Sequence, residues 1–306
     1  PIGVSTTIPV SFYKKEFEQH IKVPVADYDI LVKAHDKSKM LKIAKKIGIE
    51  IPTTYYPQSL EDVKEISKII EYPCVVKLKR GSAAKGLKYV NSPDELVKCY
   101  QNQPARSDII FDYSFPMIQE YIPGEVHDVC VLFNKGKPRA VLTQKRIKMH
   151  PASGGGGIFN VTTDEPELKR RAVKLLKRIK WHGPAQVEFK IDSRDGKPKL
   201  MEVNSKFWGT LDLSIQAGVD FPYLTCKMAV EGDIEPVFNY KVGLKYRWIF
   251  PYELLYIIES KNKLRSIKEF FHFDANTKYD IWFSDPLPHL VRSFDLIFKF
   301  LTKSSN

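Results

Sequence analysis

The chain has 306 residues, of which 43% are hydrophobic and 12% aromatic; these are values of a globular protein and exclude a disordered chain. A chain of this length can bury a large core and is expected to divide into lobes. The formal net charge of +12 favours anionic partners, but the basic residues are spread along the chain in no long run. Charge alone is therefore a weak argument for nucleic acid.

Four cysteines, Cys74, Cys99, Cys130 and Cys226, lie far apart in the sequence. Their spacing does not suggest a zinc site, so we expect free thiols in a reducing, cytoplasmic compartment. We recognise no signal peptide, and no apolar run approaches the roughly 18 residues of a membrane-spanning helix.

The first third of the chain predicts short strands and capped helices. Residues 1–33 contain two strand-like pieces separated by a helical segment. A helix is predicted from Asp36, whose side chain can cap it, to Gly48. Another helix follows Ser59. Then comes a hydrophobic strand and the loop 80–86, whose Gly, Ser and Ala residues let backbone amides approach an anion.

The middle of the chain is rich in alternating, strand-like segments. Strands are predicted at 117–122, 126–133 and 137–147. A loop with four consecutive glycines, Gly154–Gly157, follows and precedes an amphipathic helix over 165–180.

The segment from Val187 to Asn204 predicts a β-hairpin. Apolar and polar residues alternate along both arms, so Glu188, Glu202 and Asn204 converge on one face. Two carboxylates and an amide oxygen on a rigid sheet suit Mg²⁺ that carries a polyphosphate. The alternative is an ordinary half-exposed hairpin with charged residues on its wet side.

Taken in order, these segments resemble the ATP-grasp superfamily, in its carboxylate–amine ligase and carbamoyl-phosphate-synthase-like branch. The resemblance lies in the lysine-bearing strand PCVVKLK, the loop GSAAKG, the hinge MIQEYI and the continuation MEVNSKFWG. It covers roughly residues 36 to 236. It implies an α+β fold in which two α+β lobes bind ATP between them.

The resemblance also implies a division of the chain. Residues 1–33 would be the remnant of an N-terminal Rossmann-like domain that precedes the ATP-grasp lobes. The N-terminal lobe would cover 34–116 and the C-terminal lobe 117–236. In the aromatic, basic extension 237–306 we expect an amphipathic helix packed on the core, with peripheral membrane contact as the lesser alternative.

Nucleotide binding is implied for both lobes. Lys77 would bind the α- and β-phosphates, the loop would cover them, and hinge backbone groups would read adenine. His127 stands where the family holds the ribose, with Glu125 or Asp128 as alternatives. The resemblance thus assigns the nucleotide to Lys37, Lys77, Ser82, Lys85, Gln119, Glu120, Tyr121, Ile122 and His127.

Catalytic and metal-binding roles follow from the same resemblance. Arg146 would touch the γ-phosphate or the reacting carboxylate, and Lys206 replaces a common arginine, which keeps the charge but loses the bidentate fork. Glu202 would bridge two Mg²⁺ ions, Glu188 would bind one, and Asn204 would complete the site, with Mn²⁺ as a substitute metal.

The implied function is ATP-dependent ligation. A small carboxylate would be activated as an acyl phosphate and joined to an amine or, less often, a thiol. Two alternatives stay open: an ATP-binding regulatory or scaffold module that has lost its chemistry, and a basic nucleic-acid binder. We expect no specific nucleic acid partner, and a homodimer is one assembly to consider.

Overall fold

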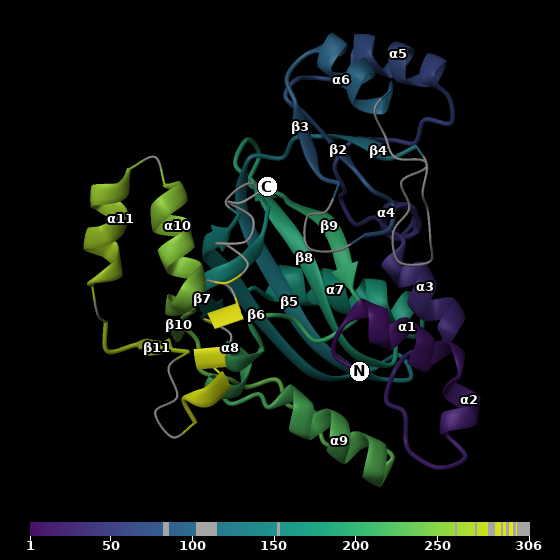
Figure 1. Ribbon diagram of the computed structural model, residues 1–306. Helices are drawn as coiled ribbons and strands as arrows, with labels where there is room; N and C mark the ends of the chain where they lie inside the picture. The colour runs from purple at the N-terminus through teal and green to yellow at the C-terminus, as the bar shows by residue number, and fades with distance from the viewer. Residues whose placement is uncertain are drawn as a thin grey trace.

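The computed structural model describes residues 1–81, 86–101, 115–151, 154–260, 262–272, 274–280, 285–288, 290, 291, 294, 295 and 298. These residues form two β-sheets with helices packed on them (Figure 1). One sheet has four strands in the order β1-β4-β2-β3, and the other has seven in the order β11-β10-β7-β6-β5-β8-β9. The prediction of a mixed α+β fold is confirmed.

The four-stranded sheet is antiparallel, and the helices α5 and α6 cover one of its faces (Figure 1). The alternation in β2 sends Cys74 and Val76 to the core under these helices, together with Ile118. The elements are β1 (Thr54–Tyr55), α5 (Leu60–Ile69), β2 (Cys74–Lys77), β3 (Lys88–Val90), α6 (Pro93–Gln101) and β4 (Met117–Glu120).

The seven-stranded sheet is antiparallel except for β10 and β11, which pair in parallel at one edge. It lies at the centre of the molecule (Figure 1). Its strands are β5 (Gly124–Asn134), β6 (Lys137–His150), β7 (Gly156–Thr163), β8 (Gly183–Asp192), β9 (Pro198–Asn204), β10 (Lys245–Arg247) and β11 (Thr277–Tyr279).

Strand alternation divides the large sheet into two faces. Val129, Val131 and Phe133 of β5 pack in one core with α3, α4 and α7. Cys130 and Leu132, between them, pack in a second core with α8 and α9. The helices are α3 (Tyr28–His35), α4 (Lys37–Lys46), α7 (Pro166–Arg178), α8 (Leu211–Gln216) and α9 (Phe221–Glu231).

The start of the chain is helical and not strand-like as predicted. Residues 1–33 are all described, and they contain α1 (Val4–Phe12), α2 (Lys14–Phe17) and most of α3 but no strand. In α1 the residues Val4 and Ile8 are buried one turn apart in the core of the large sheet. Tertiary packing therefore overrides the β-propensity of this segment. The Rossmann-like remnant is not confirmed.

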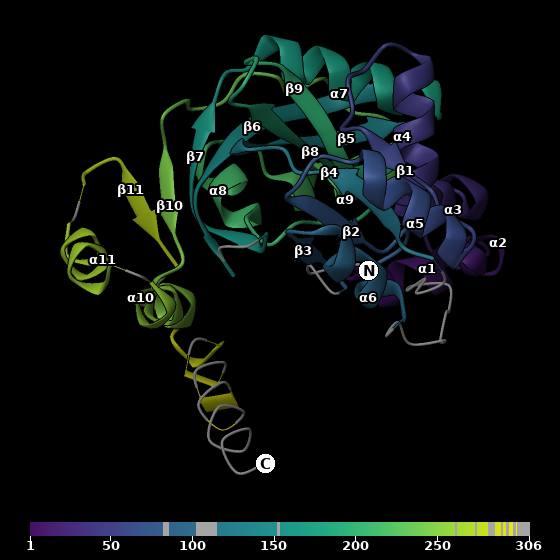
Figure 2. The same cartoon turned by 90° about the horizontal axis from the view of Figure 1, so that it is seen from above.

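The C-terminal extension adds two strands to the edge of the large sheet and places a helical pair beyond it. Figure 2 shows α10, α11 and the strands β10 and β11 to one side of β7. No helix among the described residues is long and apolar enough to cross a membrane. The helices are the π-helix η1 (Ile249–Glu253), α10 (Leu254–Glu259) and α11 (Lys263–Phe270).

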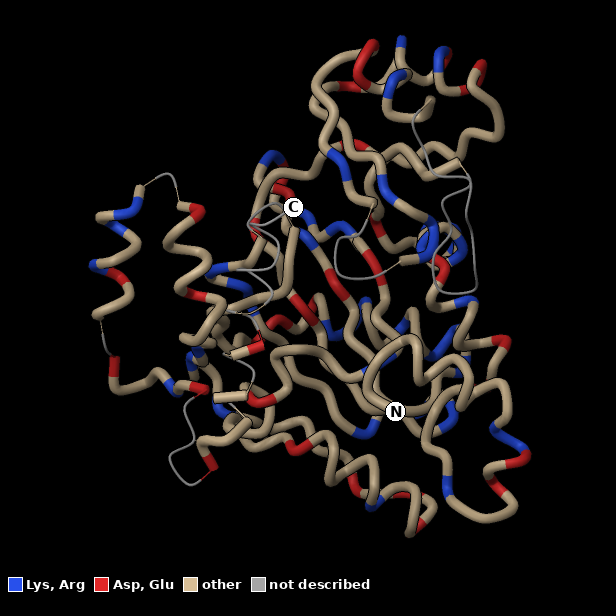
Figure 3. The backbone as a smooth tube through the Cα atoms, in the orientation of Figure 1, with Lys and Arg blue, Asp and Glu red and all other residues tan. Residues whose placement is uncertain are grey.

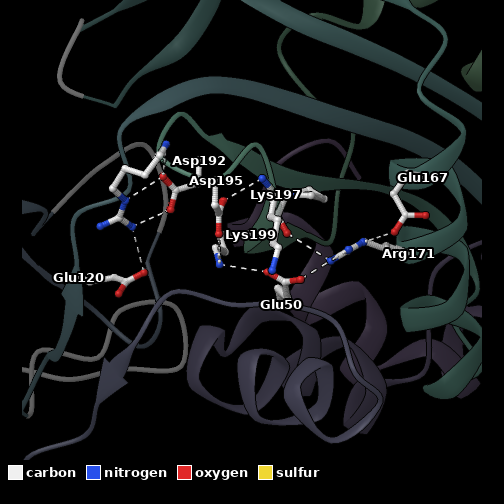
Figure 4. Close-up of polar contacts among 10 residues, drawn as sticks. Glu50, Glu120, Glu167, Arg171, Asp192, Asp195, Lys197 and Lys199 are labelled. Atoms are coloured by element: carbon white, nitrogen blue, oxygen red, sulfur yellow. Dashed lines mark hydrogen bonds and ion pairs between the residues drawn. The ribbon is translucent and has the colours of Figure 1, made fainter.

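Ion pairs hold the β8–β9 hairpin against its neighbours. Lys199 of β9 lies 3.0 Å from Glu50, which follows α4 (Figure 4). At the hairpin turn, Arg194 contacts Asp192 at 2.6 Å and Glu120 of β4 at 3.5 Å. The hairpin is therefore tied to both the small sheet and the helical layer, which fixes the position of its acidic residues.

Candidate active site

A cleft of about 820 Å³ lies between the small sheet and the large sheet. Gln186, Glu188 and Lys190, which are alternate residues of β8, line its floor. Residues of β2 and the start of α4 line the opposite wall. Blue and red segments of the chain meet at the centre of Figure 3, in the region between the two sheets. The cleft is therefore a charged site that is lined by both acidic and basic groups.

Two lysines form the basic wall. Lys77 ends β2, and burial lowers its pKa to about 8 although Glu202 opposes the shift. Lys37 is the first residue of α4, whose N-terminus is capped by the Asp36 side chain. The Lys37 Nζ donates to the Gly81 carbonyl at 2.9 Å and lies 3.1 Å from Glu202. Both predicted phosphate-binding lysines thus reach the cleft.

The hairpin presents its polar face to these lysines, as the sequence predicts. Glu188 pairs with Glu202 across β8 and β9, and Gln186 pairs with Asn204. The Asn204 amide donates to Glu202 at 3.2 Å and to Gln186 at 3.3 Å. In this arrangement the Asn204 amide oxygen accepts no hydrogen bond within the described part of the chain. It is therefore available to a ligand.

The two carboxylates differ in their electrostatic surroundings. Burial raises the pKa of Glu188, and Arg146 opposes that rise. Burial alone would also raise the pKa of Glu202, but Lys37 and Lys77 outweigh it and hold the pKa below the usual value. The cations of the protein therefore neutralise the acidic pair.

These residues fit Mg²⁺ as a metal bound together with a polyphosphate. No group of three or more His, Cys, Asp or Glu that could hold a metal occurs among the described residues. Two carboxylates and one amide oxygen leave most coordination positions to phosphate oxygens and water, which is the usual arrangement for Mg²⁺. Cations already lie against both carboxylates, which shows that the pair requires positive charge.

Arg146 lies at the centre of the cleft and is already engaged. Its Nε and one terminal nitrogen donate to Asp128 at 2.9 and 2.6 Å. The same terminal nitrogen donates to Glu188 at 2.5 Å, and the other donates to the Gly155 carbonyl at 3.2 Å. Burial opposes its charge, but Asp128 and Glu188 raise the pKa of Arg146. Arg146 therefore stays charged between the acidic pair and the glycine loop.

Lys206 also lines the cleft, and its ammonium group has fewer contacts. The Nζ atom makes one long hydrogen bond, 3.5 Å, to the Phe207 carbonyl. Burial lowers the pKa of Lys206, and Glu202 opposes the shift. Because this cation is weakly held, it can bind an incoming anion without losing a strong partner.

The predicted hinge, residues 117–122, also contributes to the cleft. Gln119, Glu120, Tyr121 and Ile122 all contribute to its surface. The Gln119 side chain donates to Thr54 at 2.8 Å, which leaves the backbone of this segment as its main polar contribution. A backbone edge beside apolar side chains suits a planar base.

Lys190 and Tyr89 are cleft residues that the sequence analysis missed. The Lys190 Nζ donates to the Ile122 carbonyl at 2.5 Å and lies 5.1 Å from the centre of the Tyr121 ring. The Tyr89 and Tyr121 rings make an edge contact with centroids 5.8 Å apart. The alternation Glu188, Lys190 on β8 was a signal for Lys190, whereas the Tyr89 contact joins separate strands.

His127 does not line the cleft, so the structure gives no support to its predicted role at the ribose. On β5 it alternates with Val126 and Asp128, so its ring lies on the opposite face of the sheet. There it is 3.6 Å from Glu125 and 3.8 Å from Glu165. Burial lowers the pKa of His127. Of the two alternatives, Asp128 is paired with Arg146 and Glu125 with Lys145.

Three of the four consecutive glycines line the cleft. A Cβ at Gly155 would lie 2.0 Å from the His150 carbonyl oxygen, and one at Gly157 would lie 2.2 Å from Asn160. Gly156 faces open space, and with Gly154 and Gly155 it borders the cleft. The glycines therefore allow the β6–β7 connection to close tightly beside Arg146. Ser82 and Lys85 lie outside the described residues.

Comparisons with known proteins agree on one family. A family model described as "ATP-grasp in the biosynthetic pathway with Ter operon" matches residues 114–250. The carbamoyl phosphate synthase large chain of Vibrio cholerae is 24% identical over 227 residues, which are 70% of this chain and 20% of that protein. The Pyrococcus furiosus large chain is 24% identical over 213 residues, 66% of this chain and 19% of that protein. The chain thus spans about a fifth of these relatives.

Solved structures show the same fold at low identity. The biotin carboxylase of Campylobacter jejuni, described as a β-γ-ATP complex, aligns with a TM-score of 0.67 and 18% identity. The match covers 78% of this chain and 55% of that one. An L-amino acid ligase from Bacillus licheniformis aligns with a TM-score of 0.56 and 19% identity, covering 75% of this chain and 58% of that one.

Proposed function

The chain belongs to the ATP-grasp superfamily, and from this premise we propose that it is an ADP-forming ligase. It activates a small carboxylate with Mg-ATP and joins it to an amine, with a thiol as the less frequent nucleophile. We also propose that residues 34–116 and 117–236 are its two ATP-binding lobes and 237–306 an extension.

One observation carries the proposal: the cleft places two lysines opposite two paired carboxylates, with an arginine beside them. Lys37 is 3.1 Å from Glu202, and Arg146 is 2.5 Å from Glu188. A polyphosphate with bound Mg²⁺ has the complementary arrangement, because its oxygens meet the lysines and its metal meets the carboxylates. A binding site for an uncharged ligand has no use for this arrangement.

The nucleotide occupies the cleft from the hinge to the lysines. Backbone groups at Glu120 and Ile122 hold adenine, and Tyr121 supplies part of the surface beside it. Lys77 and Lys37 bind the phosphates. We also assign phosphate contacts to Ser82 and Lys85, which lie outside the described residues.

Phosphoryl transfer takes place at the other end of the cleft. Glu188, Glu202 and Asn204 would hold Mg²⁺, which supplies charge neutralisation for the transferring phosphoryl group. Arg146 donates N–H groups toward the γ-phosphoryl oxygens, and Lys206 binds the acceptor carboxylate. The Arg146 guanidinium is held by Asp128 before the reaction, so it can stabilise developing negative charge with little reorganisation.

The reaction needs no nucleophile from the protein. A substrate carboxylate oxygen attacks the γ-phosphorus, ADP leaves, and an acyl phosphate forms. The amine then attacks the acyl carbon and releases phosphate. The glycines that border the cleft beside Arg146 limit the access of water, which would otherwise hydrolyse the intermediate.

A trapping assay tests the proposal. The protein, ATP and Mg²⁺ are incubated with hydroxylamine and a panel of amino and hydroxy acids, and ADP and hydroxamate are measured. We expect ADP release that depends on one class of acid, together with the matching hydroxamate. Tight nucleotide binding without acid-dependent ADP release would instead identify a binding or regulatory module.

A further inference from the structure

Asp128 is a fully buried carboxylate beside the cleft, and the proposed reaction has not yet used it. It lies in the middle of β5 with 0% exposure. Both of its oxygens accept from Arg146, in a bidentate pair with distances of 2.9 and 2.6 Å. A bidentate pair fixes the plane of the guanidinium as well as its position. Asp128 therefore sets how Arg146 faces the cleft.

Arg146 divides its donors between a permanent and a replaceable partner. The Asp128 pair is buried, whereas the Glu188 side chain is 18% exposed and borders the cleft. A metal ion bound to Glu188 competes with Arg146 for the negative charge of that carboxylate and weakens the hydrogen bond between them. The Arg146 N–H group of this weakened bond is held by Asp128 at the place where the phosphoryl group arrives.

The Gln144 side chain connects the Asp128–Arg146 ion pair to the loop after β9. The Gln144 amide donates to Asp128 at 3.1 Å and to the Thr210 hydroxyl at 2.6 Å. Thr210 follows the segment that carries Lys206 and Trp208, which both line the cleft. Asp128 is therefore connected through one side chain to the acceptor side of the site.

We propose that Asp128 is a positioning residue. It holds the Arg146 guanidinium in place when Glu188 gives up its contact with Arg146 and binds Mg²⁺. Asp128 neutralises Arg146, which weakens the hold of Arg146 on Glu188 and leaves that carboxylate available to the metal. The inference rests on the proposed function, because it concerns the same metal and phosphoryl group.

If Asp128 positions Arg146, removal of its charge should lower the metal affinity selectively. A purely structural role of Asp128 predicts no such selectivity. In Asp128→Asn, Glu188 is the remaining carboxylate that pairs with Arg146. Arg146 therefore competes more strongly with the metal ion for Glu188. The metal affinity then decreases while nucleotide binding without metal does not change. A loss of packing alone would weaken both or would only lower the melting temperature.

The experiment measures free Mn²⁺ by electron paramagnetic resonance in the presence of ADP. We expect Asp128→Asn to raise the half-saturating Mn²⁺ concentration about tenfold, because an uncompensated cation acts on the ligand at close range. Asp128→Glu, which restores the charge, is expected to recover most of the affinity. Unchanged Mn²⁺ affinity in a folded Asp128→Asn protein overturns the proposal.

A double-mutant cycle with Arg146→Gln isolates the mechanism. Once Arg146 is removed, Asp128→Asn should alter the Mn²⁺ affinity by less than about twofold. An equal tenfold loss in that background also overturns the proposal, since Asp128 would then act without Arg146. The cycle measures binding only, so failure of the wild-type protein to bind Mn²⁺ and ADP contradicts the proposed function instead.

A second variant decides the case if Asp128→Asn does not fold. Gln144→Leu removes the hydrogen bonds to Asp128 and Thr210 but keeps the ion pair and nearly the same volume. We expect it to fold and to raise the half-saturating Mn²⁺ concentration about threefold, because Asp128 loses one of its fixing contacts. A folded Gln144→Leu protein with wild-type Mn²⁺ affinity contradicts the positioning role.

Discussion

Arg146 and Lys148 are two positions apart on β6, yet they belong to different charge clusters. Residues two apart on a regular strand share a face. Between these two the register shifts, and the β-bulge turns their side chains apart. Arg146 faces Glu188 in the cleft, whereas Lys148 lies 3.1 Å from Glu253 and 3.0 Å from Glu269 in the C-terminal extension.

The two clusters differ in what surrounds them. Glu253 is 0% exposed, and Arg247 donates to both of its oxygens at 3.0 and 2.7 Å. The Arg247 guanidinium also lies 5.4 Å from the centre of the Phe159 ring. Among the described residues, both oxygens of the buried Glu253 therefore accept from cations, while the Arg146 cluster borders a cleft. The first is suited to hold the extension in place and the second to exchange partners with a ligand.

Substitution in the cleft cluster is expected to have the largest effect on activity. Glu202→Gln removes a carboxylate that the proposed metal requires, so turnover should fall at least about 1000-fold while the fold stays intact. Acid-dependent ADP release and the far-ultraviolet circular dichroism spectrum measure the two properties. Near-wild-type turnover in this variant would contradict the assignment of Glu202 as a metal ligand.

Substitution in the Glu253 cluster is expected to have the opposite effect. Glu253→Gln leaves Arg247 and Lys148 without their shared buried partner, which should lower the free energy of unfolding by about 3–5 kcal/mol. Urea denaturation measures this loss, and Mg-ADP affinity of the folded protein should not change.

A matched control uses the exposed partner of the same lysine. The Glu269 side chain is 40% exposed, so Glu269→Gln should cost less than about 1 kcal/mol. If Glu253→Gln is no more destabilising than Glu269→Gln, the buried cluster does not hold the extension. A large loss of nucleotide affinity in Glu253→Gln would show that the two clusters are coupled.

Local periodicity in the sequence was enough to predict the acidic wall of the cleft. Alternation along the hairpin placed Glu188 and Glu202 on one face, and their pairing across β8 and β9 is observed. Alternation along β2 likewise separated Lys77 from Val76, which packs in the core. These predictions succeeded because a strand fixes the direction of each side chain within a few residues.

The structure departs from the sequence predictions where the local pattern was disregarded or insufficient. Alternation alone groups His127 with Val129 and Val131, which pack in the core, but spacing in the resembled family suggested the ribose. Residues 1–33 were predicted with strands because the sequence signal there is weak and packing decides the outcome. The Lys148–Glu253 contact joins residues 105 positions apart, which no local pattern can predict.

A pH-dependent effect is expected at Lys77. Burial places the pKa of Lys77 at about 8 in the free protein. Bound phosphates stabilise its charged form and raise that pKa, so ADP binding should take up a proton above pH 8. Affinity for ADP should be nearly independent of Lys77 titration below pH 8 and should fall by up to about tenfold per pH unit above it.

Calorimetry in buffers with different ionisation enthalpies measures the proton uptake. Lys77→Met is the control: it should bind ADP more weakly at every pH and lose the additional decrease between about pH 8 and 10. Lys190 and Lys206 also have lowered pKa values through burial, so a decrease that persists in Lys77→Met belongs to them. ADP affinity that Lys77→Met leaves unchanged at every pH would contradict the assignment of Lys77 to the phosphates.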